Sequence, residues 1–365
     1  MKDFFFEIVE CLQRNERIVL ATIVSSSGSS PLPSGAMMLV KSGEGETVGS
    51  VGGGLLEALV TEEAMKMLAE KREPQIVKFD LNDDVSNEGM VCGGSVDILL
   101  EEIPQRDRPT YDALVRLRND GSDAILISTL DSVRNLSKII YSSKQEALPD
   151  PIRNVAGSES ERVINVLRHS FGQEDAKLVK VSNAEIVIQP IRGLQNLIIF
   201  GGGHVSKYLA QVATMAGFST TVIDDREEFA NAERFPSSAR VVAVEYEKAF
   251  EKIEIKPSTY IVIVTRGHSS DEQVLEKAVH TQARYIGMIG SKRKVIACYE
   301  NLMARGTPAD MLRRVHAPIG LNIGAVSAEE IAVSIAAELV RTRRGFGEPS
   351  APIAEQLSEW FQKRE

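Results

Sequence analysis

Cysteine is scarce in this sequence. Among 365 residues there are only three, Cys11, Cys92 and Cys298. They lie far apart along the chain, and none has the close spacing of a metal-binding pair. This pattern argues against a disulfide framework, a structural zinc site and an iron–sulfur cluster. It is typical of proteins from a reducing compartment.

Basic charge and long apolar runs are lacking as well. Asp and Glu number 51 against 42 Lys and Arg, which gives a net charge of −9. A general nucleic-acid binder needs a basic surface for the phosphates, so the net charge argues against this class. Glu7 and Glu10 interrupt the apolar residues at the start of the chain, which predicts an amphipathic helix there and neither a signal peptide nor a membrane span. We therefore expect a cytoplasmic protein that binds neither nucleic acid nor membrane.

The most informative pattern in the chain covers residues 197–225. An apolar run, Leu197–Phe200, leads into three glycines, and a segment with helical periodicity follows from His204 to about Met215. A second apolar run, Thr220–Ile223, ends in an acidic pair. The order of strand, glycine loop, helix, strand and acid predicts a βαβ unit of the Rossmann type.

This pattern is suited to a ligand that carries phosphate. Gly201 and Gly203 would let the backbone come close to an anion. The helix that begins at His204 would offer free N–H groups and the positive end of its dipole. Glycines that only allow a tight turn would leave the same pattern, so the sequence predicts the fold without fixing the ligand.

Four loops are expected at one edge of the same sheet. From about Leu194 onward, short apolar runs alternate with helical segments, which predicts a doubly wound parallel sheet in an α/β fold. Ligands bind beyond the carboxyl ends of such strands. The candidate binding residues in these loops are Gly201, Gly203, His204, Asp224, Arg266, His268, Ser291, Lys292 and Arg293.

The cations and histidines among these candidates allow two interpretations. Positive charge within an acidic chain indicates a negatively charged small ligand. Lys292 and Arg293 could instead be solvated residues at a helix start, although cations there oppose the helix dipole. His204 and His268 could transfer protons, orient a ligand, or simply be exposed.

The first hundred residues predict an α+β region with a second candidate site. Gly52, Gly53 and Gly54 precede a predicted helix at Leu55–Lys71, so they could form another anion site. Cys92 lies among glycines in GMVCGG. It could be a thiolate ligand, a sulfur acceptor or a small buried residue.

The segment between these regions is harder to interpret. We expect helices at Tyr111–Arg118 and Glu159–Arg168, strands at Ala124–Leu130 and near Glu185–Ile188, and a loop over Ser142–Gly157. The predicted division is an N-terminal α+β domain (1–104), a connecting segment of uncertain fold (105–193), a Rossmann-like domain (194–344) and a tail with one short helix (345–365).

Several blocks of the sequence resemble the XdhC/CoxI family. SSSGSSPLPSGAMML, GSVGGGLLE and GMVCGG are similar to its N-terminal signatures, and IFGGGHVSKYLA, VIVTRGHSSD and YIGMIGSKRK to its C-terminal Rossmann domain. The family comprises accessory factors of xanthine dehydrogenase and related molybdenum hydroxylases. Its characterised members bind the molybdenum cofactor (molybdopterin), protect it while a cysteine desulfurase supplies its terminal sulfur, and pass it to the apo-enzyme.

The resemblance implies roles for particular residues. Cys92 matches the family's cysteine in the CGG block and would contact molybdenum through the cofactor. The blocks GGGH at 201–204, TRGH at 265–268 and GSKR at 290–293 match its binding loops. Many relatives carry a cysteine directly after the VGGG run. That position is Leu55 here, so a role of that thiol does not transfer.

The resemblance also implies partners, and competing functions remain open. We expect a maturation chaperone, acting as a homodimer on a xanthine dehydrogenase-type apo-enzyme together with a cysteine desulfurase. The alternative is an NAD(P)-binding oxidoreductase in which Asp224 or Asp225 holds a ribose hydroxyl. A xanthine dehydrogenase itself is not expected, because three scattered cysteines cannot ligate an ordinary iron–sulfur cluster.

Overall fold

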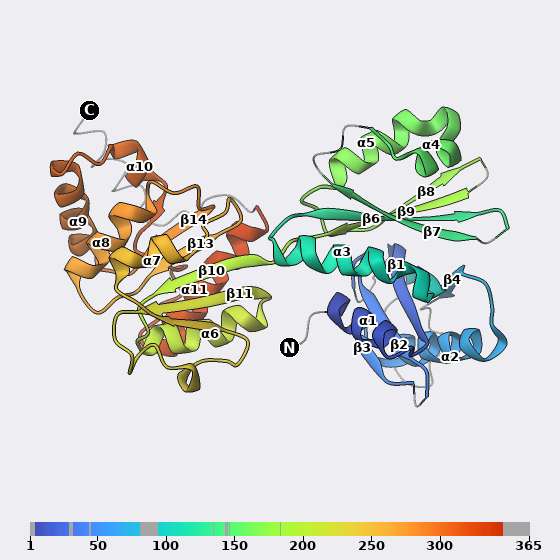
Figure 1. Ribbon diagram of the computed structural model, residues 1–365, viewed down its shortest axis with the longest axis horizontal. Coiled ribbons are helices and arrows are strands. Elements are labelled where there is room, and N and C mark those ends of the chain that lie inside the picture. The colour runs from blue at the N-terminus through green and yellow to red at the C-terminus, as the bar shows by residue number, and fades with distance from the viewer. Residues whose placement is uncertain are drawn as a thin grey trace. The chain divides into compact units, whose positions relative to one another are not determined.

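The computed structural model describes residues 4–28, 32–43, 45–80, 94–133, 135–142, 145, 147–182 and 184–345. The chain divides into two compact units, Lys2–Gly193 and Leu194–Glu365. Neither unit shares a sheet with the other (Figure 1). Each unit also has its own hydrophobic clusters. The predicted division into four parts stays a prediction.

The first sheet of the N-terminal unit is antiparallel, with strand order β3-β2-β1-β5-β4. Its strands are β1 (Ile18–Gly28), β2 (Met37–Lys41), β3 (Thr47–Gly49), β4 (Gln75–Asp80) and β5 (Gly94–Glu102). The long helix α2 (Gly54–Glu70) packs on one face through residues spaced three and four apart, such as Leu56, Val60, Ala64 and Met67. This spacing places them on one side of the helix.

The N-terminal helix is amphipathic, as the sequence predicts. α1 (Phe4–Gln13) buries Phe5, Ile8 and Leu12. These residues pack in one cluster with Tyr111 and Leu114 of α3 (Arg108–Asn119). Within the described ranges, no helix is long and apolar enough to cross a lipid bilayer.

The segment that the sequence left without a fold forms a second antiparallel sheet. Its order is β7-β6-β9-β8, with β6 (Ala124–Asp131), β7 (Leu136–Ser142), β8 (Lys177–Val181) and β9 (Ala184–Ile191). The central strands β6 and β9 match the two predicted strands. The edge strands β7 and β8 were missed, because lysines and partly exposed positions interrupt their apolar pattern.

The prediction of a loop over Ser142–Gly157 is wrong for its second half. Asp150–Ala156 forms helix α4, which packs beside α5 (Ser160–Ser170) in one cluster with the sheet. Pro151 lies in the first turn of this helix, where a proline removes no intrahelical hydrogen bond.

The C-terminal unit contains the predicted parallel sheet. Its order is β12-β11-β10-β13-β14-β15, with β10 (Gln195–Phe200), β11 (Phe218–Asp224), β12 (Arg240–Ala243), β13 (Tyr260–Ile263), β14 (Tyr285–Met288) and β15 (Val315–His316). This is the strand order of dinucleotide-binding Rossmann folds, so the predicted fold class is confirmed. The two-residue strand β15 was not predicted, because so short a run carries no periodicity.

Helices cover both faces of this sheet (Figure 1). α6 (His204–Met215) and α11 (Ala328–Arg343) pack in one cluster, and α7 (Tyr246–Lys252), α8 (His268–Ala278) and α9 (Lys292–Ala304) in the other. A further short helix, α10 (Ala309–Arg313), precedes β15. Because both faces are buried, strands such as β10 and β13 are apolar almost throughout. Ser327 and Glu330 form a capping box at the start of α11.

Candidate functional site

The candidate site lies where the strand order reverses. β10 pairs with β11 on one side and with β13 on the other, all in parallel. The loops that follow these strands, Gly201–Gly203, Asp225–Arg226 and Thr265–His268, therefore share one edge of the sheet. We call these three loops the switch-point edge. In open α/β sheets this edge is the usual place for ligands.

The three glycines after β10 have different environments. Gly201 has a φ of 106°, and a Cβ there would lie 2.4 Å from the carbonyl oxygen of Val264. A Cβ at Gly202 would lie 2.6 Å from the carbonyl oxygen of Phe229. At Gly203, by contrast, it would meet no described atom within 4 Å beyond its chain neighbours. The first two glycines thus allow tight backbone packing, and the third leaves open space at the start of α6.

Two neighbouring helices begin at this edge with glycine caps. Gly203 is the N-cap of α6 and Gly267 that of α8, and no described side chain caps either start. A Cβ at Gly267 would also meet open space, judged by the described residues. Free N–H groups and helix dipoles favour an anion here. His204 and His268, the first residues of the two helices, are both exposed.

His204 also has an acidic neighbour that the sequence did not indicate. Glu329 lies in the first turn of α11. A hydrogen bond from Tyr208 is the main cause that holds the pKa of the Glu329 carboxyl below its ordinary value, and His204 adds a smaller electrostatic contribution. An acidic side chain therefore lies close to the start of α6.

Asp224 is buried and already has several hydrogen-bond donors. Its Oδ2 accepts from the backbone N–H of Gly202 at 2.7 Å and from Nη2 of Arg226 at 3.0 Å. Its Oδ1 accepts from the backbone N–H and Nε of Arg226 at 3.0 and 2.9 Å. Burial alone would raise the pKa of this carboxyl, but these donors outweigh it and the pKa is lowered. Asp224, at the end of β11, thus holds the glycine loop in place through its hydrogen bond to Gly202. Binding of a cofactor by Asp224 stays a prediction.

Asp271 connects the loop after β13 with the start of α9, and the sequence pattern did not point to this residue. It is 1% exposed, and its Oδ1 accepts from the hydroxyl of Thr265 at 2.6 Å and from the backbone N–H of Thr265 at 3.2 Å. Its Oδ2 accepts from Nζ of Lys294 at 2.6 Å. An acid in the first turn of a helix usually complements the dipole at the surface, so the sequence offered no signal for this buried role.

The loop after β14 supplies the other predicted cations. Ser291 is the N-cap of α9, and its hydroxyl accepts from the backbone N–H of Lys294. Lys292 and Arg293 line a shallow pocket of about 520 Å³ along α9 with Ile296, Ala297 and Glu300. The consecutive cations Lys292, Arg293 and Lys294 therefore have different environments. Lys294 forms an ion pair with Asp271, whereas Arg293 is exposed.

The second predicted anion site is filled by the chain's own carboxylate. Gly52 and Gly53 precede α2 with φ values of 130° and 75°, and Gly54 begins it with a φ of 56°, which explains the need for glycine. Oε1 of Glu57 accepts from the backbone N–H of Gly53 at 3.0 Å and from the hydroxyl of Ser50. This carboxylate would repel an added anion. Binding of a cofactor by these glycines stays a prediction.

Neither described cysteine offers a thiolate. Burial raises the pKa of the Cys11 thiol to about 11 and that of Cys298 to about 12. Among the described residues, no group of three or more His, Cys, Asp or Glu side chains could hold a metal ion. Cys92, the predicted contact to molybdenum, lies outside the described residues.

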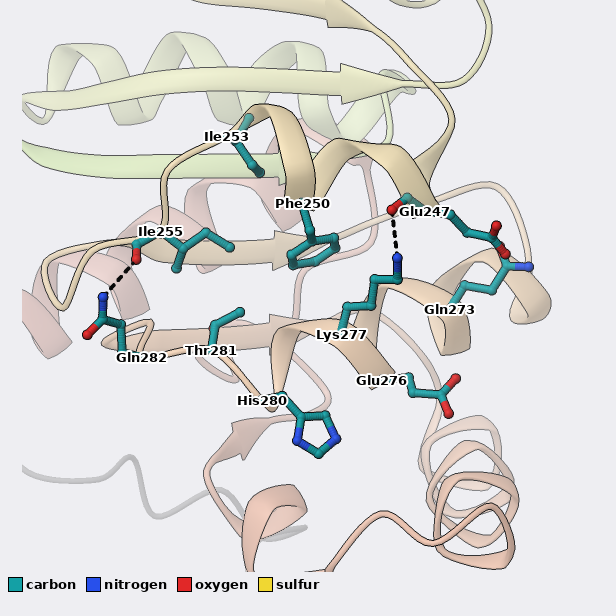
Figure 2. A pocket seen from close by; sticks show the side chains of 10 residues that line it. All are labelled: Glu247, Phe250, Ile253, Ile255, Gln273, Glu276, Lys277, His280, Thr281 and Gln282. Atoms are coloured by element: carbon teal, nitrogen blue, oxygen red, sulfur yellow. Dashed lines mark hydrogen bonds between the residues drawn. The ribbon is translucent and has the colours of Figure 1, made fainter.

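A larger pocket lies away from these loops. Figure 2 shows it between α7 and α8, with Phe250, Ile253 and Ile255 along one side. Its volume is about 740 Å³, and a hydrogen bond from Lys277 to the carbonyl oxygen of Glu247 bridges it. Its loop residues precede β13 and β14, so it lies at the amino ends of these strands, opposite the switch-point edge.

Curated proteins of similar sequence cover nearly all of this chain. YqeB, an uncharacterized protein of Escherichia coli K12, is 26% identical over 97% of the chain. A protein of Bacillus subtilis, described as a probable subunit of xanthine dehydrogenase, is 26% identical over 94% of the chain and 98% of its own length. The molybdenum cofactor insertion chaperone PaoD of Escherichia coli K12 is 22% identical over 92% of the chain and 86% of its own length. The chain spans about half the length of YqeB.

A solved structure has the same architecture. It is described as the crystal structure of a xanthine dehydrogenase from Bacillus halodurans, and it is 26% identical with a TM-score of 0.73. The match covers 96% of this chain and 99% of that one.

Two family models match the chain, and their ranges include every sequence block that resembles the family except GMVCGG at 89–94. The XdhC Rossmann domain matches residues 197–339, and the XdhC and CoxI family matches residues 11–80. Together they cover more than half of the chain, in the order in which the two units occur. The chain belongs to the XdhC and CoxI family.

Proposed function

We propose that this protein binds the molybdenum cofactor and assists its sulfuration and insertion into a xanthine dehydrogenase-type molybdenum hydroxylase. The observation that carries the proposal is the pair of glycine-capped helix starts at the switch-point edge of an XdhC Rossmann domain. Family membership and the likeness to a molybdenum cofactor insertion chaperone support a role in molybdoenzyme maturation.

The residues at the switch-point edge fit a cofactor that carries phosphate. The backbone N–H groups after Gly203 and Gly267 would hold the phosphate, because a Cβ at either position would fill the space that an anion needs. Arg266, Lys292 and Arg293 would add positive charge near it. His204 and His268 would donate hydrogen bonds that orient the ligand. The bound cofactor itself supplies the molybdenum centre on which the partner hydroxylase depends.

Sulfuration would need a thiol, and Cys92 is our candidate. Cys11 and Cys298 are buried with raised pKa values, so they cannot serve as thiolates at neutral pH. Leu55 stands where many relatives have a second cysteine. We therefore propose that Cys92 alone contacts molybdenum through the cofactor, while a cysteine desulfurase supplies the sulfur and the chain acts as a homodimer.

The experiment is to purify the protein from a molybdenum-replete host and weigh it by native mass spectrometry. We expect the mass of a retained pterin in the wild type and its loss in Gly203→Val, because the branched side chain would keep a phosphate off the backbone N–H groups. Gln211→Val is the control, since it introduces the same side chain at an exposed position of the same helix. A folded Gly203→Val protein that retains the pterin would contradict the proposed site.

An NAD(P)-binding oxidoreductase is the second candidate, and the strand order favours it. The hydrogen bonds of Asp224 to Gly202 and Arg226 occupy the acceptors that a ribose would need, so Asp225 is the acid that would have to hold it. Titration of the protein with NADH or NADPH, followed by nicotinamide fluorescence, tests this function. A saturable change in fluorescence would favour it over the cofactor chaperone.

A further inference from the structure

An ion pair extends across the switch-point edge. Oδ2 of Asp225 lies 3.5 Å from Nη2 of Arg266. Asp225 directly follows β11, and Arg266 is in the loop that follows β13. These strands flank β10 on opposite sides, so the pair joins the two loops on either side of the glycine loop.

The two acids after β11 have different roles. Asp224 is fully buried and is held by the backbone N–H of Gly202 and by Arg226. The Asp225 side chain is 26% exposed, and its Oδ1 lies 3.7 Å from Nε of Arg226, a guanidinium already bound to Asp224. Arg226 thus interacts with both acids, whereas the ion pair of Arg266 is with Asp225.

The pair with Arg266 can be exchanged for a ligand. The Arg266 side chain is 57% exposed, and ion pairs so open to water are weak. A phosphate at the glycine-capped helix starts offers the guanidinium stronger, charge-assisted hydrogen bonds. Once Arg266 turns to the phosphate, the Asp225 carboxylate remains nearby as a like charge.

We infer that Asp225 is a specificity-determining residue of this edge. In the free protein its carboxylate forms an ion pair with Arg266. When a phosphate group binds, Arg266 contacts the phosphate in place of Asp225. The carboxylate then repels any ligand that has a further anionic group on the β11 side. The inference rests on the proposed function in one respect, that the switch-point edge binds a phosphate-bearing ligand. The preferred ligand of the switch-point edge would therefore have a single terminal phosphate.

The test compares Asp225→Asn with the wild type by calorimetric titration with inorganic phosphate and with pyrophosphate at low salt. We expect the variant to bind pyrophosphate about five- to tenfold more tightly, because one like charge within a few ångströms is removed. The gain should be smaller for phosphate, which carries less charge, and should shrink as salt is added. A purely structural role of Asp225 would not produce this dependence on ligand charge and salt.

Two further variants control the result. Glu227→Gln makes the same change in net charge at an exposed acid two residues along, and we expect it to leave both affinities nearly unchanged. Adding Arg266→Gln to Asp225→Asn should remove the gain. Equal pyrophosphate affinity in wild type and Asp225→Asn would overturn the inference while leaving the proposed site intact. Absence of binding in both proteins would overturn the inference and the site together.

Discussion

At the scale of single residues, the glycines after β10 have different roles: Gly201 is needed for packing, and Gly203 for the proposed binding of a ligand. A side chain at Gly201 would meet the backbone of Val264 and require a left-handed conformation, so we expect Gly201→Ser to lower the free energy of unfolding by about 2 kcal/mol or more. Gly203→Ser adds a good N-cap residue in open space and should leave stability within about 0.5 kcal/mol. Its hydroxyl would occupy N–H groups that a ligand needs, so pyrophosphate binding should weaken. Thermal melts and titrations of both variants check this, and equal melting temperatures would contradict it.

Asp224 predicts a particular acid dependence of stability. Its pKa in the folded protein lies below the ordinary value of 3.8, so the stability it contributes is fully present above that value. This contribution is lost as pH falls through the lower pKa of the folded state. We expect Asp224→Asn to be less stable than wild type at pH 6 and to lose less stability on further acidification below pH 4. Urea denaturation at a series of pH values measures this, and parallel stability curves would contradict it.

Asp224 and Asp225 show a limit of prediction from the sequence. The pattern predicted an acidic pair at the end of β11, and the pair is there. Which acid is buried depends on the approach of Gly202 and Arg226, a tertiary contact that periodicity does not encode. The same holds for Asp271, whose place in the first turn of a helix suggests an exposed residue.

At the scale of elements, buried parallel strands were the easiest to predict. β10, β11, β13 and β14 are apolar runs separated by helices, and their pattern alone indicated a doubly wound sheet. Elements whose burial is partial were harder. β7 and β8 carry lysines at the edges of their sheet, and α4 begins with a proline-containing turn. In these elements tertiary packing outweighs local preference.

The end of α2 offers a test of backbone strain at this scale. Lys71 forms its C-cap with a φ of 53°, a left-handed conformation that disfavours any residue with a Cβ. We expect Lys71→Gly to raise the free energy of unfolding by about 0.5 kcal/mol, since the relief of strain exceeds the added flexibility of the unfolded chain. Arg72→Gly is the control, because Arg72 has no left-handed φ and forms ion pairs with Glu63 and Glu70. A melting temperature for Lys71→Gly at or below that of Arg72→Gly would contradict the account.

At the scale of the whole molecule, two compact units with separate hydrophobic clusters lead us to expect two unfolding transitions. The switch-point edge belongs entirely to Leu194–Glu365, so a ligand bound there should stabilise that unit alone. At a concentration of one hundred times its dissociation constant, pyrophosphate should stabilise the unit by about 2.7 kcal/mol. Differential scanning calorimetry with increasing pyrophosphate should therefore shift one transition upward and leave the other in place. The Gly203→Val protein should show no shift of either transition. A shift of both transitions by the same amount in the wild type would mean that the two units unfold together, and a shift in Gly203→Val equal to that of the wild type would place the ligand elsewhere.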